Sequence, residues 1–129
     1  MNKILVEVSV GELFDKISIL EIKKEKIKDS EKLKFINNEH QILKKQLDNN
    51  VKSDENIEKL FKSLKEINSK LWIIEDDKRL CEKKSDFGDK FIKLSRDIHF
   101  LNDDRAKIKL EINKQTKSKI KEIKEYTEY

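Results

Sequence analysis

Only three of the 30 basic residues in this chain are arginines: Arg79, Arg96 and Arg105. A guanidinium is a planar group that can bind a carboxylate or a phosphate through two parallel hydrogen bonds, which a lysine cannot do. Arginines in a lysine-rich chain therefore indicate positions that need this geometry. We expect at least one of them, Arg96, to pair with a carboxylate of the protein, that of Glu75. The others could pair with a buried carboxylate or bind the phosphate or carboxylate of a ligand.

A polar belt interrupts the segment 94–113, which contains two of these arginines. Apolar residues recur there at three- and four-residue steps, the spacing of one face of a helix. They are Phe91, Leu94, Ile98, Leu101, Ile108 and Ile112. Asn102 and Arg105 stand where this apolar stripe should continue, and Arg96 and Asp103 flank them. Such a belt is either a device that fixes helix pairing or a binding site.

A second belt is expected to face the first one. Residues 54–82 have the cleanest helical repeat, and a short turn near residues 85–86 should fold this helix back against the next one as an antiparallel hairpin. Glu75 would then lie level with Arg96, and Asn68 level with Asp103. The candidate ligand-binding residues are Glu75, Arg79, Arg96, Asn102, Asp103, Arg105 and Lys109.

Other reactive side chains are weaker candidates. Residues 75–77 are all acidic, but a metal ion would need more carboxylates from a facing helix. Glu12 belongs to a helix cap, and Glu58 lies far from Glu75 along one long helix. We therefore expect no metal and no cofactor, and read the acidic run as salt bridges, such as Glu75 with Arg79.

Two histidines and one cysteine complete the reactive residues. His99 precedes Asp103 by one helical turn, a spacing that suits a base and its orienting carboxylate, but it lies off the apolar stripe. His40 falls on an apolar seam, which favours a hydrogen-bonded core histidine. Cys81 has no neighbouring base. Whether the protein is an enzyme stays open at this point.

The elements that position these residues are mostly helices. Residues 3–8 alternate and are β-branched, which predicts a short N-terminal β-strand. Ser9 and Glu12 then form a capping box, with Val8 and Leu13 as a hydrophobic staple, so a helix should begin at residue 10. The predicted helices span about 10–28, 31–47, 54–82, 89–113 and 119–126.

The fold class that follows is all-α: an antiparallel helical bundle or long helical hairpins in a single domain, 1–129. The chain has no proline and two glycines, which argues against a β-sandwich or barrel. Charged residues make up 43% of the chain and apolar ones 36%, so the core should be thin and self-association is favoured. We expect a homo-oligomer, most simply a dimer, that also covers the N-terminal strand.

Net charge, cysteine content and hydropathy indicate which partners and which cellular compartment to expect. The net charge is +4, but both signs are mixed and no aromatic residues interleave with the C-terminal lysines, so nucleic acid is not expected as a partner. The single cysteine favours a reducing compartment. No segment predicts a membrane span, and the expected location is the cytoplasm.

Four segments resemble a small bacterial and phage-encoded helical family known only as a domain of unknown function. They are VEVSVGELFDKISILEIK at 6–23, LWIIEDDKR at 71–79, the NDxRAxIK pattern at 102–109 and EIKEYTEY at 122–129. The resemblance covers nearly the whole chain. It implies a mostly helical protein found near sugar-nucleotide and surface-glycan functions. Because the family has no established activity, the resemblance carries over no catalytic residue.

Two functions are compatible with the sequence. The first is a non-enzymatic helical module that oligomerises or binds a partner, which the thin core and the unpaired strand favour. The second is a binding site or an active site for an anionic small molecule such as a sugar nucleotide or sugar phosphate, which the two polar belts and the arginines favour. We prefer the first.

Overall fold

The computed structural model describes residues 2–129, and four helices contain 73% of the chain. Helix α1 spans Val10–Lys26, α2 spans Ser30–Asn50, α3 spans Glu55–Lys83 and α4 spans Asp89–Gln115. The prediction of a mainly α-helical protein is confirmed. None of the helices within residues 2–129 is long and apolar enough to cross a membrane.

Serine and aspartate side chains, which are common N-caps, cap the N-termini of three helices. Ser9 Oγ accepts the backbone N–H of Glu12 at 3.0 Å, as the sequence predicted for the start of α1. Asp29 accepts the N–H groups of the first turn of α2, and Asp54 accepts that of Ile57 in α3. Ser85, which follows the C-cap of α3, is left-handed with φ 52°, a conformation that glycine usually adopts at this position.

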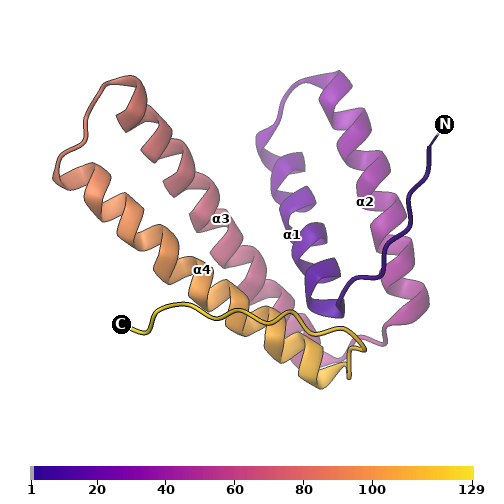
Figure 1. The fold of residues 1–129 in the computed structure, drawn as a ribbon. Helices are drawn as coiled ribbons and strands as arrows, with labels where there is room; N and C mark the ends of the chain where they lie inside the picture. The colour runs from indigo at the N-terminus through magenta and orange to yellow at the C-terminus, as the bar shows by residue number, and fades with distance from the viewer. Residues whose placement is uncertain (1) are drawn as a thin grey trace.

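The helices form two hairpins, α1–α2 and α3–α4 (Figure 1). The hairpins lie closest where α1 begins and α4 ends, and they diverge toward their turns (Figure 1). Helix α1 packs against all three other helices, whereas α2 packs on α1 alone among the helices of residues 2–129. Helix α1 is therefore the element that holds the two hairpins together.

The main core fills the end of the molecule where the hairpins meet. Its buried members come from all four helices: Phe14, Ile17, Leu47, Ile57, Leu64 and Ile112. Leu64 and Ile112 have no exposed surface. Because the hairpins diverge beyond this core, the more distant parts of α3 and α4 pack only on each other.

Two predicted elements are wrong. Residues 3–8 form no β-strand, because no segment of residues 2–129 lies beside them as a neighbouring strand. Residues 119–126 form no helix, and the tail instead lies along α4, where Glu122 pairs with Lys109. An isolated helix of this length is marginal in water, so the tail's few contacts with α4 decide its conformation.

Candidate functional site

Two side-chain oxygens, one from the end of α4 and one from the turn after it, hold the N-terminus of α1 against α4. Ser118 Oγ accepts the N–H of Val10 at 3.0 Å, and Asn113 Oδ1 accepts that of Gly11 at 2.7 Å. Ser9 Oγ accepts the third free N–H of this helix start. Gly11 lies so close to α4 that a Cβ atom there would be 2.4 Å from the backbone oxygen of Lys109. The approach fixes the register of α1 along α4.

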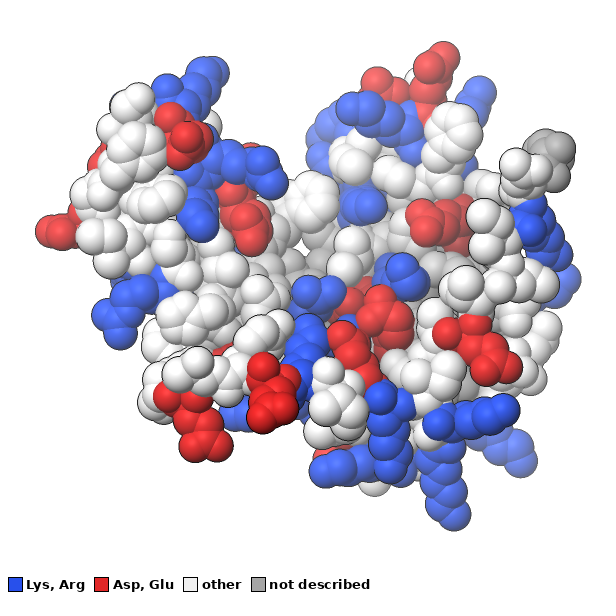
Figure 2. Space-filling view, viewed as in Figure 1, with Lys and Arg blue, Asp and Glu red and all other residues white. Residues whose placement is uncertain are grey.

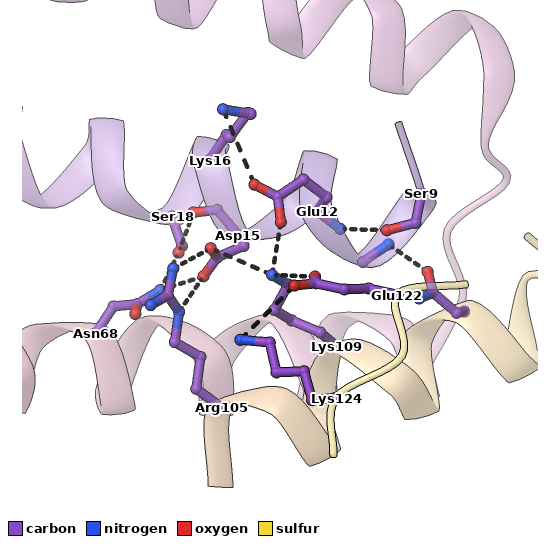
Figure 3. Close-up of polar contacts among 12 residues, drawn as sticks. Ser9, Glu12, Asp15, Lys16, Ser18, Asn68, Arg105, Lys109, Glu122 and Lys124 are labelled. Atoms are coloured by element: carbon purple, nitrogen blue, oxygen red, sulfur yellow. Dashed lines mark hydrogen bonds and ion pairs between the residues drawn. The ribbon is translucent and has the colours of Figure 1, made fainter. Parts of the chain in front are cut away.

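A buried carboxylate, Asp15, lies one turn further along α1 (Figure 3). Arg105 of α4 binds both of its oxygens, through Nε at 3.0 Å and through Nη2. Asn68 of α3 donates from Nδ2 to Asp15 Oδ1 and to Ser18 Oγ, both at 2.8 Å. Burial alone would raise the pKa of Asp15, but the hydrogen bonds from Arg105 and Asn68 outweigh it and hold the pKa below its ordinary value.

Lys109 extends this network by one turn of α4. Its Nζ donates to Glu12 at 2.6 Å and to Glu122 of the tail at 3.1 Å, and it lies 3.9 Å from Asp15 (Figure 3). Burial alone would lower the pKa of Lys109, but these carboxylates raise it above its ordinary value. Glu12 therefore pairs with Lys109 rather than reaching back to the helix cap as a capping box would have it.

A groove opens beside this network, where α1 and α3 begin to diverge. It encloses about 390 Å³, and the space-filling view shows the molecule hollowed between its two halves (Figure 2). Residues of α1, α3 and α4 line it: Ile19, Ile22, Asn68, Leu71, Trp72, Glu75, Asp76, Arg79, Asn102 and Arg105. The volume falls within the range of small-molecule sites, which is about 300–1,000 Å³.

Several polar groups of the groove have no protein partner. Within residues 2–129, Arg79, Glu75 and Asp76 make no ion pair or side-chain hydrogen bond, and Nη1 of Arg105 donates to no residue. Asn68 is buried and its amide is oriented by Asp15, which accepts only, so its Oδ1 stays free. The groove thus offers donors and acceptors together, beside the apolar surface of Trp72 and Ile19.

The structure brings four of the seven predicted site residues into this groove: Glu75, Arg79, Asn102 and Arg105. The expected pairing of Glu75 with Arg96 is wrong, since the guanidinium of Arg96 lies 5.9 Å from the ring centre of Phe100, outside the groove. Glu75 also makes no ion pair with Arg79. The arginine that pairs with a buried carboxylate is Arg105 instead.

The two remaining predicted residues have other contacts. Asp103 accepts a hydrogen bond from the hydroxyl of Tyr129 in the tail. Lys109 joins the buried network described above. Neither lines the groove.

Sequence reasoning missed three features of the site. Asp15, the partner of Arg105, carried a signal, because it follows Glu12 by three residues and so shares one face of α1. Trp72 is the only tryptophan of the chain, and it precedes Glu75 and Asp76 by one turn of α3. Ile19 and Ile22 gave no signal, because apolar residues on an amphipathic helix ordinarily belong to the core.

The remaining reactive residues lie elsewhere. His40 contacts Glu21 at 3.4 Å and Lys24 at 3.3 Å, between α1 and α2. The ring of His99 packs on Tyr129, and Cys81 is buried. In the part of the chain that the structure describes, no three His, Cys, Asp or Glu side chains are placed to hold a metal ion.

The protein is thus a small helical protein made of two hairpins. A buried Asp–Arg–Asn network joins the hairpins, and the groove beside this network is the candidate ligand site. Residues 4–129 match the model of a family of unknown function, DUF6165. The chain therefore belongs to that family. It matches no curated protein and no solved structure.

Proposed function

We propose that the groove between α1 and α3 binds a small molecule that carries one anionic group and several hydroxyl groups, such as a sugar phosphate or a sugar acid. The observation that supports this most directly is Arg79. Its guanidinium lines the groove without an ion pair to any residue of 2–129, so it can bind a phosphate or carboxylate at no cost to the fold.

The other groove residues restrict the total charge of the ligand and the chemical groups that it carries besides the anionic group. Glu75 and Asp76 more than balance the charge of Arg79, because the charge of Arg105 is already balanced by Asp15, so a ligand with several negative charges would be repelled. These two carboxylates, with the free oxygen of Asn68, would accept hydrogen bonds from hydroxyl groups. Trp72, on which the apolar face of a sugar ring would pack, provides the wall. Binding alone is proposed, and no reaction is assigned.

Thermal unfolding tests this proposal with inorganic phosphate, a neutral hexose, hexose phosphates, hexuronic acids and sugar nucleotides. A specific ligand raises the melting temperature by mass action. We expect stabilisation by a sugar phosphate or a sugar acid that neither inorganic phosphate nor the neutral hexose reproduces. A panel without any stabilising compound would contradict the proposal.

Two arginine variants, one inside the groove and one outside it, provide a test with a matched control. Arg79→Gln should weaken binding by about tenfold or more, because it removes a charge-assisted hydrogen bond. The melting temperature of the free protein should hardly change, since Arg79 is exposed and unpaired. Arg96→Gln removes the same charge outside the groove and should leave binding unchanged. Equal losses in both variants would mean that only net charge matters.

A second candidate function, assembly with another protein chain, rests on a different observation. Apolar side chains in both terminal segments are exposed, among them Leu5 and Tyr126. These segments lie outside the groove.

A further inference from the structure

The two terminal segments of the chain are non-helical and carry exposed apolar side chains. In the N-terminal segment, 3–8, Ile4, Leu5 and Val6 expose 84%, 80% and 75% of their surface. In the C-terminal segment, 119–129, Ile123 and Tyr126 expose 82% and 71%. No backbone group of either segment bonds to another backbone group of residues 2–129. Both segments therefore have the free edges and apolar side chains of strands that lack a neighbour.

The segments start side by side but run apart. The bond from the N–H of Val10 to Ser118 Oγ joins the points at which they leave the helices. From there the N-terminal segment passes along the α2 side and the C-terminal segment crosses α4, so the two chain ends lie on opposite sides of the molecule (Figure 1). The two terminal segments of one chain therefore do not contact each other along their length.

The C-terminal segment is fixed on its own helix. Glu122 binds Lys109 near one end, and at the other end the ring of Tyr129 packs on Phe100 with ring centres 5.4 Å apart. Between these anchors every residue is exposed. The segment is thus a pre-positioned template to which another extended chain can add, as in β-strand addition.

The sequences of the two segments are complementary when they are aligned antiparallel. One alignment sets Lys3 against Glu128 and Glu7 against Lys124, with Leu5 against Tyr126 between these two charge pairs. On the opposite face it sets Val8 against Ile123. Opposite charges and aromatic–aliphatic pairs directly across two strands are each stabilising. Glu122 stays outside the paired stretch, so its bond to Lys109 is kept.

We propose that a second copy of this chain covers these segments, with the N-terminal segment of each protomer adding antiparallel to the C-terminal segment of its partner. In a twofold dimer of this kind, the N-terminal segment of each protomer would lie alongside the partner's C-terminal segment in the opposite direction. The symmetry forms the contact twice. This assembly leaves the groove between α1 and α3 free, so it does not depend on the proposed function.

Cysteine cross-linking tests the pairing directly, because the native Cys81 is buried. A chain with Leu5→Cys is mixed with a chain carrying Tyr126→Cys under mild oxidation, and a covalent heterodimer is expected. The matched control replaces Leu5→Cys by Phe35→Cys, which is equally exposed but lies on α2, and should give none. A chain with both Leu5→Cys and Tyr126→Cys should give covalent dimers, whereas a disulfide within the monomer would overturn the proposal.

Two solution measurements complete the test. Light scattering of the unmodified protein at about 100 μM should give the mass of a dimer, and a monomer would overturn the proposal. Lys3→Glu combined with Glu7→Lys should raise the dimer dissociation constant by about tenfold, because it replaces attractive pairs by repulsive ones. Adding Lys124→Glu and Glu128→Lys to that chain should restore the dissociation constant of the unmodified dimer, because both charge pairs become attractive again. If the Lys3→Glu, Glu7→Lys variant keeps the dissociation constant of the unmodified dimer, this alignment is excluded.

Discussion

Asp15 decides which arginine is free to bind a ligand. It is 1% exposed, and a buried carboxylate is costly unless it is paired and hydrogen-bonded. Arg105 and Asn68 meet that need, so the guanidinium of Arg105 is largely committed to the fold. Removing Arg105 would therefore disturb the folded protein itself, which is why Arg79 is the informative position for ligand binding.

Gly11 gives a prediction at the same scale. Gly11→Ala should destabilise the protein by about 2–3 kcal/mol, because the new Cβ would lie 2.4 Å from a backbone oxygen that cannot move without shifting α4. Chemical denaturation of the two proteins measures the difference.

The other glycine is the control for this substitution. A Cβ at Gly88 would meet nothing closer than 3.5 Å, and its φ of −81° suits any residue. Gly88→Ala should therefore be neutral or stabilise by about 0.5 kcal/mol. If both substitutions cost the same, the close approach of α1 to α4 does not exist in solution.

At the scale of the elements, the start of α1 illustrates what local sequence specifies. The Ser9 cap was predictable because its acceptor and donor lie three residues apart in the chain. Asn113 and Ser118 cap the same helix start from more than 100 residues away, and no local pattern announces them. The same contrast applies to α1 as a whole, because its contacts with three other helices follow from the tertiary packing.

Ser9→Ala should lower the free energy of unfolding by about 1 kcal/mol, since the N–H of Glu12 loses its acceptor. Asn113→Ala should cost more, about 2 kcal/mol, because it leaves the N–H of Gly11 buried without a partner. Urea denaturation of both variants tests the order. A larger loss for Ser9→Ala would mean that the end of α4 does not cap α1.

The elements that were mispredicted share one physical cause. The patterns at 3–8 and 119–126 are real, but a strand needs a neighbouring strand and a short helix needs a surface to pack on. The four long helices were predictable because each has enough apolar positions to bury a face. For the site, the polar belt at Asn102 and Arg105 was visible in the sequence, whereas the pairing of Arg105 with Asp15 was not, because pairing across helices depends on their packing.

At the scale of the whole molecule, the two hairpins are joined through the contacts of α1 with α3 and α4. Besides the apolar core, the α1–α3 side has the ion pair of Lys65 with Glu25 at 2.9 Å. The α1–α4 side has the pairs of Arg105 with Asp15 and of Lys109 with Glu12. The groove lies beside Asp15, whose partners Asn68 and Arg105 both line it.

Acid should therefore loosen the joint between the hairpins. The pKa of Asp15 is lower in the folded protein than its ordinary value of 3.8, so the unfolded chain takes up the proton first as the pH falls. The stability that Asp15 contributes is fully present well above pH 3.8 and is lost as the pH falls below it. The lowered pKa of Glu122, caused by its hydrogen bond with Lys109, adds a loss of the same sign.

Urea denaturation at a series of pH values between about 7 and 2 measures this effect, with the emission of Trp72, the only tryptophan, reporting on the groove. Asp15→Asn should already be destabilised at pH 7 by about 3 kcal/mol, because it leaves Arg105 without its carboxylate in a largely buried position. Its unfolding free energy should then fall less steeply with acid than that of the unmodified protein. Parallel pH profiles for the two proteins would show that another carboxylate, and not Asp15, holds the hairpins together.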